Sequence, residues 1–509
     1  MATNGILIAG LSGGSGKSLI AVGLVAALKE RGMTIAPFKK GPDYIDAGWL
    51  KLAARLPPAA ACASRLSNDV SQADANKNGQ AGRPCYNLDP YLVPADRLLE
   101  HFRRRAAGAD LAIIEGNRGL YDGVTADGGY ASADLAMLLD LPVILVVDCT
   151  KMTRTVAALV LGCQQFEPRL DIAGVILNQI ATNRQERLIR QTVERATGIA
   201  VLGATPRLSK DIFPMRHLGM LPWQEYDGHD QAIAELAHLA REHCDLDKII
   251  AMARPVAPPS ACLLRQAPAE VRRQGGILLR IGVFHDASFQ FYYTENLEAL
   301  QNLDAELIAI NALTDSALPE NLDGLYIGGG FPETSARQLA DNSNFRQAVR
   351  QASADSLPIY AECGGLIYLC QSIEVDGAVF PMAGIFPARL KMEEKPQAHG
   401  YCHFEVDGDN PFYQRGAAIR GHEFRYSRVI GWPNEPTLLA LRMTRGQGFA
   451  DGRDGLLFRN TLALYTHVHA DGAPEWAEGF IACCRRRRKE KMEQRMDETA
   501  PLSTWPDSV

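Results

Sequence analysis

The sequence predicts an α/β protein of two domains, each built on a mainly parallel β-sheet. The chain has 509 residues, more than the roughly 250–300 residues at which a single hydrophobic core stops growing. Short β-branched runs alternate with helical stretches through about residue 225, and a second alternation begins at Leu279. This alternation is typical of parallel strands covered by helices on both faces.

The expected elements follow from apolar periodicity. In the N-terminal half, buried strands are expected at Gly5–Ala9, Thr34–Phe38, Leu111–Ile114, Val143–Val147 and Ile172–Leu177. Helices are expected there at Ser18–Glu30, Ser132–Leu139, Thr153–Gln165 and Arg184–Thr197. In the C-terminal half, strands are expected at Arg280–Phe284, Leu307–Asn311, Gly324–Ile327 and Pro358–Tyr360.

Proline content and loss of periodicity mark the expected domain boundaries. The segment Met252–Gln274 holds Pro255, Pro258, Pro259 and Pro268 and is the best linker. We therefore expect domains at 1–251 and 276–484, separated by a linker at 252–275. Residues 57–82 are polar and aperiodic, which indicates a surface insertion. The last segment, 485–509, begins with a basic run and is expected to be a disordered tail.

Bulk composition excludes several classes of protein. The formal net charge of -6 argues against a nucleic-acid partner, because phosphate binding requires a basic face. The 11 cysteines form no C-x-x-C pair, so a zinc or iron–sulfur site is not expected. An odd cysteine number without a signal peptide favours the reducing cytoplasm. The apolar N-terminus is interrupted by glycines, which argues against a membrane span.

A glycine-rich loop follows the first expected strand and leads into a helix. The segment Gly10–Ser18 reads GLSGGSGKS. Glycines let backbone N–H groups converge on phosphate oxygens at a helix N-terminus. Lys17 would reach the β- and γ-phosphates, and Ser18 would bind Mg²⁺. The expected ATP-binding residues are Gly13, Gly14, Ser15, Gly16, Lys17 and Ser18.

The spacing of this loop selects a branch of the P-loop proteins. Five residues separate Gly10 from Gly16, one more than usual, which resembles the dethiobiotin synthetase and partition-ATPase branch. Partition ATPases carry an extra lysine where this chain has Ser12. A synthetase is therefore favoured over a positioning ATPase.

Acidic residues follow two expected strands of the same domain. Asp43 and Asp46 come after the second strand, and Glu115 and Asp122 come after the third. Ligands bind at the carboxyl ends of strands in open α/β sheets, and carboxylates there can hold Mg²⁺ against a triphosphate. We expect these four residues to form the acidic cluster of a synthetase site, with Ser18, Asp43 and Glu115 as metal ligands.

A cysteine in a strand-to-helix turn is the sharpest motif of the C-terminal half. Cys363 follows a strand and precedes Gly364-Gly365, the sequence of a nucleophile elbow. Gly329 and Gly330, after another strand, would form an oxyanion hole with Gly364. The thiol needs a base, and strand alternation would place both His467 and His469 on one face. Periodicity alone does not choose between these two histidines.

Together these motifs resemble the cobyrinic acid a,c-diamide synthases, which are class I glutamine amidotransferases that amidate tetrapyrrole side chains. The matching segments span about positions 5–480. They are Gly10–Ser18, Gly41–Asp46, Cys85–Pro90, Glu115–Gly123, Arg216–Gly219, Phe291–Asn296, Gly328–Glu333, Ala361–Gly365, Gly421–Ser427 and His467–His469.

The resemblance implies a dethiobiotin-synthetase-like P-loop domain followed by a class I glutaminase domain. It implies ATP and Mg²⁺ as cofactors and phosphorylation of a substrate carboxylate. L-Glutamine would be hydrolysed through a Cys363 thioester, and the released ammonia would attack the acyl phosphate. The first histidine of the pair, His467, would be the base, and this branch is described without an essential acidic third member.

The resemblance leaves the macrocycle open among polycarboxylate tetrapyrroles. Cobyrinate amidated at its a and c acetates is the leading substrate. Lys395–Tyr401 and Tyr465–Ala470 look closer to a sub-branch that amidates sirohaem, and another acts on nickel sirohydrochlorin. A cobyric acid synthase is a further alternative. A partner-regulated nucleotide switch is disfavoured by Ser12 and by the intact Cys363–His467 pair. A homodimer is compatible with all of these.

Overall fold

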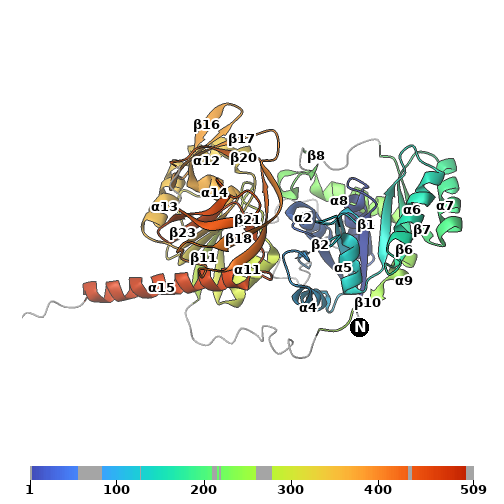
Figure 1. Ribbon diagram of the computed structural model, residues 1–509, viewed down its shortest axis with the longest axis horizontal. Coiled ribbons are helices and arrows are strands. Elements are labelled where there is room, and N and C mark those ends of the chain that lie inside the picture. The colour runs from blue at the N-terminus through green and yellow to red at the C-terminus, as the bar shows by residue number, and fades with distance from the viewer. Residues whose placement is uncertain are drawn as a thin grey trace, which may run out of the picture. The chain divides into compact units, whose positions relative to one another are not determined.

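The computed structural model describes residues 3–55, 83–126, 128–208, 215–216, 219–259, 278–433 and 438–499. The chain divides into two compact units, Met1–Ala267 and Pro268–Val509, and Figure 1 shows a sheet flanked by helices in each. The expected insertion at 57–82 lies outside the described residues. Within the described part of the chain, no helix is both long enough and apolar enough to span a membrane.

The first unit is built on a sheet with the strand order β3-β2-β4-β1-β5-β6-β7. Neighbours along this order pair in parallel, as predicted. The strands are β1 (Asn4–Gly10), β2 (Ile35–Lys40), β3 (Tyr86–Leu88), β4 (Leu111–Gly119), β5 (Val143–Asp148), β6 (Ile172–Ile180) and β7 (Ala200–Pro206). Carboxyl ends of parallel strands meet at one edge, so β1, β2 and β4 bring their following loops together.

Helices flank this sheet. They are α1 (Lys17–Glu30), α2 (Tyr44–Ala53), α4 (Ala95–Ala106), α5 (Ser132–Leu139), α6 (Arg154–Phe166), α7 (Asn183–Thr197), α8 (His229–His243) and α9 (Leu246–Met252). Helix α1 is buried almost throughout and packs in one core cluster with α2, α8 and α9 and with strands β1, β2 and β4. That packing fixes the N-terminus of α1 behind the glycine-rich loop. Short elements complete the unit, namely β8 (Met215–Arg216), β9 (Gly219–Met220), η2 (Trp223–Glu225) and β10 (Arg254–Pro255).

The second unit contains a ten-stranded mixed sheet of order β12-β11-β13-β14-β23-β22-β21-β18-β19-β24. The first five strands are parallel: β12 (Ala305–Ile310), β11 (Leu279–Phe284), β13 (Gly324–Ile327), β14 (Ile359–Glu362) and β23 (Thr461–Leu464). The rest are antiparallel: β22 (Arg453–Phe458), β21 (Leu439–Arg445), β18 (Ala398–Val406), β19 (Ala418–Arg425) and β24 (His467–Val468). This pairing places β23 beside β14 and so carries His467 to the strand that precedes Cys363.

A smaller sheet and several helices complete the second unit. The sheet has the order β16-β15-β17-β20, with β15 (Cys370–Val375), β16 (Ala378–Pro381), β17 (Phe386–Met392) and β20 (Ser427–Gly431). The helices are α11 (Thr294–Asn302), η3 (Pro332–Ser335), α12 (Ala336–Asp341), α13 (Ser343–Ala354), α14 (Gly364–Leu369) and α15 (Pro474–Thr499).

The first residues of the expected linker belong to the first unit. Residues Arg254–Pro255 pair with β1, and the Val256 amide donates to the Thr3 carbonyl at 2.8 Å. Arg254 also forms ion pairs with Asp140 and Asp171. These contacts hold the segment to the first sheet, so the first unit extends past residue 251. Residues 260–275 of the expected linker lie outside the described residues.

The expectation of a disordered tail from residue 485 was wrong for most of its length, because α15 continues to Thr499. Arginines of the basic run attach this helix to the second unit. Arg485 donates to the Leu303 carbonyl, Arg487 to that of Asp355 and Arg488 to that of Leu278, and Arg488 also pairs with Asp323. Residues 500–509 lie outside the described part.

Candidate functional sites

The glycine-rich loop joins β1 to α1 and holds four of the predicted ATP-binding residues, and the other two, Lys17 and Ser18, begin α1. Gly14 and Gly16 have φ values of 78° and 88°, a left-handed conformation that favours glycine. The Ser15 hydroxyl accepts from the Ser12 amide at 3.0 Å and donates to the Ser12 carbonyl at 2.8 Å. This loop is therefore pre-shaped by its own side chains.

Asn178, two residues before the end of β6, supports the loop and was not found from the sequence. Its Nδ2 donates to the Ser15 carbonyl at 2.9 Å, and its Oδ1 accepts from the Thr205 hydroxyl at 2.7 Å. A Cβ atom at Gly16 would lie 2.1 Å from Asn178 Nδ2. Position 16 therefore favours glycine for two reasons, its positive φ and this close approach of Asn178.

Three residues predicted for the acidic site come together at the carboxyl edge of the first sheet. Ser18 Oγ donates to Glu115 Oε1 at 2.6 Å and lies 3.4 Å from Asp46 Oδ2. Lys39, the penultimate residue of β2, is fully buried between the two acids. Its Nζ is 2.5 Å from Asp46 Oδ2 and 2.8 Å from Glu115 Oε1. Sequence reasoning missed Lys39, although a lysine ending an otherwise buried strand was the available signal.

The other two acidic residues have different contacts. Asp43 Oδ1 accepts from the Asp46 amide at 3.0 Å and so caps α2. Asp122 Oδ2 accepts from the Gly119 amide at 2.9 Å and closes the turn after β4. Asp46, rather than Asp43, is the carboxylate beside Ser18, so we replace Asp43 by Asp46 in the candidate metal set.

Burial and charge together set protonation in this cluster. Burial lowers the pKa of Lys39, but Asp46 and Glu115 outweigh it and raise the pKa above the usual range. Burial raises the pKa of Asp46, but Lys39 reverses this and leaves it below the usual value. For Glu115, burial and the neighbouring Asp46 raise the pKa to about 7 despite Lys39. Asp46 and Glu115 both contact the Lys39 ammonium, and the charge of Lys17 also lowers the pKa of each.

In the second unit, Cys363 occupies the predicted elbow between β14 and α14. Its φ of 45° and ψ of -97° are unusual for a residue with a side chain. The Cys363 amide donates to the Leu464 carbonyl at 2.8 Å, and the Gly365 amide donates to that of Gly328 at 3.1 Å. These bonds hold the strained turn between neighbouring strands.

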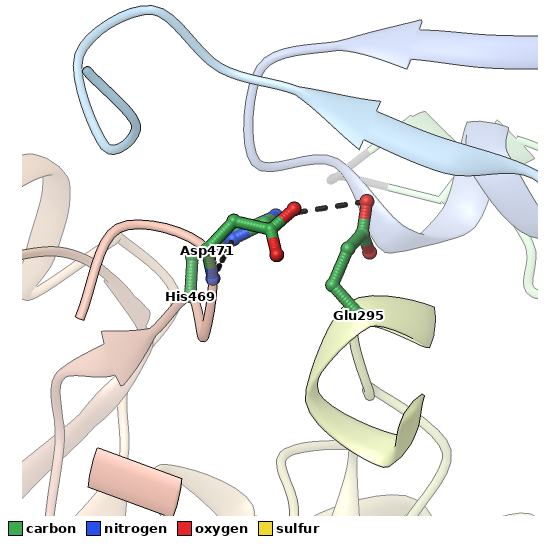
Figure 2. Close-up of side chains that lie close together, drawn as sticks. All are labelled: Glu295, His469 and Asp471. Atoms are coloured by element: carbon green, nitrogen blue, oxygen red, sulfur yellow. Dashed lines mark hydrogen bonds and ion pairs between the residues drawn. The ribbon is translucent and has the colours of Figure 1, made fainter. Parts of the chain in front are cut away.

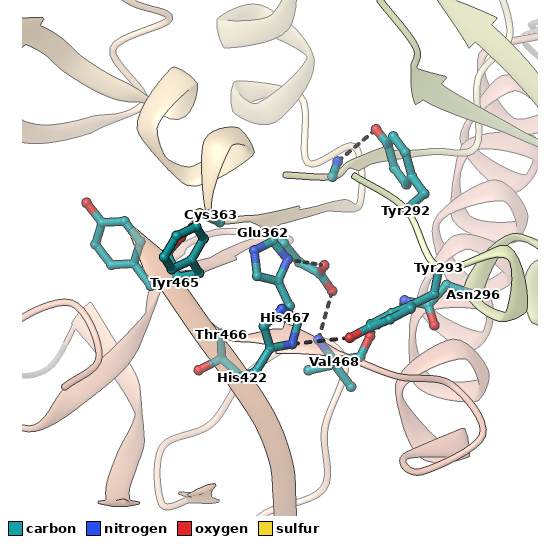
Figure 3. Close-up of polar contacts among 12 residues, drawn as sticks. Tyr292, Tyr293, Asn296, Glu362, Cys363, His422, Tyr465, Thr466, His467 and Val468 are labelled. Atoms are coloured by element: carbon teal, nitrogen blue, oxygen red, sulfur yellow. Dashed lines mark hydrogen bonds and ion pairs between the residues drawn. The ribbon is translucent and has the colours of Figure 1, made fainter. Parts of the chain in front are cut away.

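His467 lies against Cys363 and forms a hydrogen bond with it. Its Nδ1 is 3.2 Å from Glu362 Oε2, and Figure 3 marks this contact with a dashed line. Burial on its own lowers the pKa of His467, but the hydrogen bonds with Cys363 and Glu362 outweigh burial and raise the pKa to about 10. A protonated imidazole beside the sulfur stabilises a thiolate, the nucleophilic form of cysteine.

His469 is directed elsewhere, which resolves the choice that periodicity left open. Its Nε2 is 3.7 Å from Glu295 Oε1, and its Nδ1 accepts from the Asp471 amide at 3.2 Å (Figure 2). The two histidines were expected on one face of a strand, but β24 ends at Val468. Residue 469 has therefore left the strand alternation, and only His467 faces the elbow.

The three glycines predicted for the oxyanion hole lie around the elbow. A Cβ atom at Gly364 would lie 2.9 Å from the Gly330 nitrogen, so the two backbones are in close contact. A Cβ atom at Gly329 would lie 2.5 Å from His467 Cε1, and one at Gly330 would lie 1.9 Å from the Ser288 carbonyl oxygen. Each position therefore requires glycine, and the assignment to an oxyanion hole remains a prediction.

We expect Gly330→Ala to lower glutaminase kcat about 10²–10³-fold, the usual effect of losing one oxyanion donor. The added methyl would displace the Gly330 peptide from the Ser288 carbonyl. Steady-state glutamine hydrolysis measures the effect. Gly400→Ala is the matched control, because Gly400 also has a positive φ, 141°, but a Cβ atom there would contact nothing within 4 Å. Equal losses in both variants would contradict a specific role for Gly330.

Comparison with known proteins gives a family for each of the two units. Residues 6–217 match the family model of the CobQ/CobB/MinD/ParA nucleotide binding domain, and residues 280–475 match that of the CobB/CobQ-like glutamine amidotransferase domain. A cobyrinate a,c-diamide synthase of Magnetococcus marinus is 41% identical over 93% of this chain and 95% of its own length. The chain belongs to the cobyrinate a,c-diamide synthase family.

A second family member, from Archaeoglobus fulgidus, is 37% identical over 95% of this chain and 98% of its own length. Both matches extend across the P-loop unit and the glutaminase unit. The family resemblance predicted from the motifs is thus confirmed along almost the whole chain. In this cobyrinate a,c-diamide synthase family member, the nucleotide-binding unit carries the Lys39 cluster and the amidotransferase unit carries the Cys363 elbow.

Proposed function

We propose that the chain catalyses ATP- and glutamine-dependent amidation of the a and c acetate carboxylates of cobyrinate. The observation that carries this proposal is near full-length similarity to cobyrinate a,c-diamide synthases together with two intact sites. One site would bind a nucleoside triphosphate, and the other would supply a thiol nucleophile. Glutamine-dependent amidation needs both sites, because one would activate the carboxylate and the other would release the ammonia.

In the synthetase unit, Ser18, Asp46 and Glu115 would hold Mg²⁺. Their oxygen donors suit this hard cation, and the buried Glu115 Oε2 has no hydrogen-bond partner among the described residues. Bound Mg²⁺ would supply positive charge to the phosphates. Lys17 and the loop amides would bind the β- and γ-phosphates, and Lys39 would neutralise charge as a substrate carboxylate attacks the γ-phosphoryl group. The products are ADP and an acyl phosphate.

In the glutaminase unit, the Cys363 thiolate would attack the amide carbon of glutamine. Backbone amides at Gly330 and Gly364 would stabilise the oxyanion. His467, as the imidazolium, would give its proton to the leaving nitrogen, so that ammonia departs and a thioester remains. Water, deprotonated by neutral His467, would then release glutamate. The ammonia would attack the acyl phosphate, forming the amide and inorganic phosphate.

The substrate is tested by mass spectrometry of products from cobyrinate, sirohaem and nickel sirohydrochlorin, each with ATP, Mg²⁺ and glutamine. We expect cobyrinate to gain two amides at the highest kcat/KM. Faster amidation of sirohaem would show that sirohaem is the substrate, which is the alternative indicated by Lys395–Tyr401. ATP hydrolysis that ignores every macrocycle would contradict the proposal.

A further inference from the structure

We infer that Glu362 is the positioning residue of the glutaminase site, orienting His467 and sustaining its charge from the position directly before the nucleophile. This inference rests on the proposed glutaminase activity. It departs from the expectation that the Cys363–His467 pair acts without an acidic third member.

The carboxylate of Glu362 binds the histidine segment at two points. Oε2 is 3.2 Å from His467 Nδ1, and Oε1 accepts from the Val468 amide at 3.4 Å. Glu362 is 1% exposed and His467 is 2% exposed, so water does not compete for either group. With Nδ1 engaged by Glu362, the other ring nitrogen is available to Cys363 (Figure 3). One carboxylate therefore fixes both the ring and the backbone that carries it.

The strained elbow explains how adjacent residues reach one ring. In a regular strand, neighbouring side chains point to opposite faces. Cys363 leaves the strand with φ 45°, so its side chain and that of Glu362 both contact His467. The unusual backbone at Cys363 thus lets two adjacent side chains contact the same imidazole. Glu362 can therefore orient His467 without an acidic residue two positions after the histidine.

The charged and titratable groups around His467 support this role. Glu362 and Cys363 face it from β14 and the elbow, and His422 stacks on it from β19 at 4.8 Å between ring centroids. Burial, and next the charge of His467, depress the pKa of His422 well below its usual value, so His422 is neutral. Burial holds the pKa of Glu362 above its usual value, and the hydrogen bonds from His467, the Val468 amide and the Tyr326 hydroxyl oppose this rise without cancelling it. The Val468 amide can only donate, which favours the carboxylate form.

The sign of the pH effect follows. The pKa of His467 lies near 10, above its ordinary value near 6.5. The protonated ring therefore persists through neutral pH and is lost as pH rises through about 10. Removing the Glu362 charge removes one of the groups that raise this pKa, so the alkaline limb of the kcat/KM profile should move to lower pH.

The test compares Glu362→Gln with the wild type in three measurements. We expect glutaminase kcat to fall about 10²–10⁴-fold, as for orienting acids in catalytic triads, with KM for glutamine changed less than about threefold. The alkaline limb should shift to lower pH, and ammonium-dependent amidation should be retained. Glu362→Asp, which keeps the charge, should recover part of the kcat and the pH limb.

The matched control is Asp323→Asn. Asp323 is another buried carboxyl that accepts from one amide, that of Arg280 at 2.8 Å, and from one side chain, Arg488 at 3.2 Å. It lies before β13, at the amino end of the strand. Wild-type kcat in Glu362→Gln, or a loss without a pH shift, would overturn the inference. Absence of glutaminase activity in the wild type would instead contradict the proposed function itself.

Discussion

Replacing Cys363 by alanine is expected to abolish glutamine-dependent amidation, by on the order of 10⁴-fold or more, the scale seen when a covalent nucleophile is removed. Amidation with ammonium salts should remain near the wild-type rate, because the Lys39 cluster belongs to the other unit and is unchanged. Product formation from each nitrogen source measures both quantities in one preparation.

Cys370→Ala is the matched control for this variant. Cys370 is buried seven residues further on, at the start of β15. Burial raises the pKa of its thiol above the usual range, which keeps it protonated and unreactive. Glutaminase activity that survives in Cys363→Ala, or that is lost equally in Cys370→Ala, would show that Cys363 is not the nucleophile.

The second large effect is expected for Lys39→Met, which should stop amidation with either nitrogen source, by about 10³-fold. The variant leaves the buried Glu115 and the partly buried Asp46 without the ammonium that both contact. Breaking such a buried pair costs about 3–5 kcal/mol of stability. Glutamine hydrolysis should continue, because Cys363 and His467 belong to the other unit.

Lys248→Met provides the control for loss of a lysine ion pair in the same unit. Lys248 pairs with Asp245 at 2.9 Å, but its side chain is 67% exposed, and such surface pairs contribute only about 0–1 kcal/mol. Amidation in this control should be unchanged. If Lys39→Met amidates with ammonium at the wild-type rate, Lys39 has no role in the synthetase reaction.

Most parallel strands of the two main sheets were predictable because buried parallel strands are short continuous apolar runs, although β3, β7 and β23 were missed. Gly324–Ile327 and Ser132–Leu139 match their expected bounds. The antiparallel strands after residue 370 were not predicted. They alternate buried and exposed residues, as in β18 and β19, and contain charged and glycine residues that obscure the apolar signal. Their positions depend on tertiary pairing more than on local sequence.

The same contrast holds for the sites. The glycine loop and the Cys363 elbow are local motifs, so sequence spacing was sufficient to find them. Lys39 and Glu362 act through contacts with residues 76 and 105 positions away. Each is a charged residue in the last two positions of a fully buried strand. Because burying an unpaired charge is costly, that pattern was the available signal for a partner supplied by the fold.

The central claim is that Cys363 releases the nitrogen that the P-loop unit fixes onto cobyrinate. Its most direct test is incubation of the wild-type chain with cobyrinate, ATP, Mg²⁺ and glutamine labelled with ¹⁵N in the side-chain amide. We predict a diamide whose two new nitrogens both carry the label, with no labelled product from Cys363→Ala. Unlabelled or absent diamide from the wild-type chain would contradict the claim.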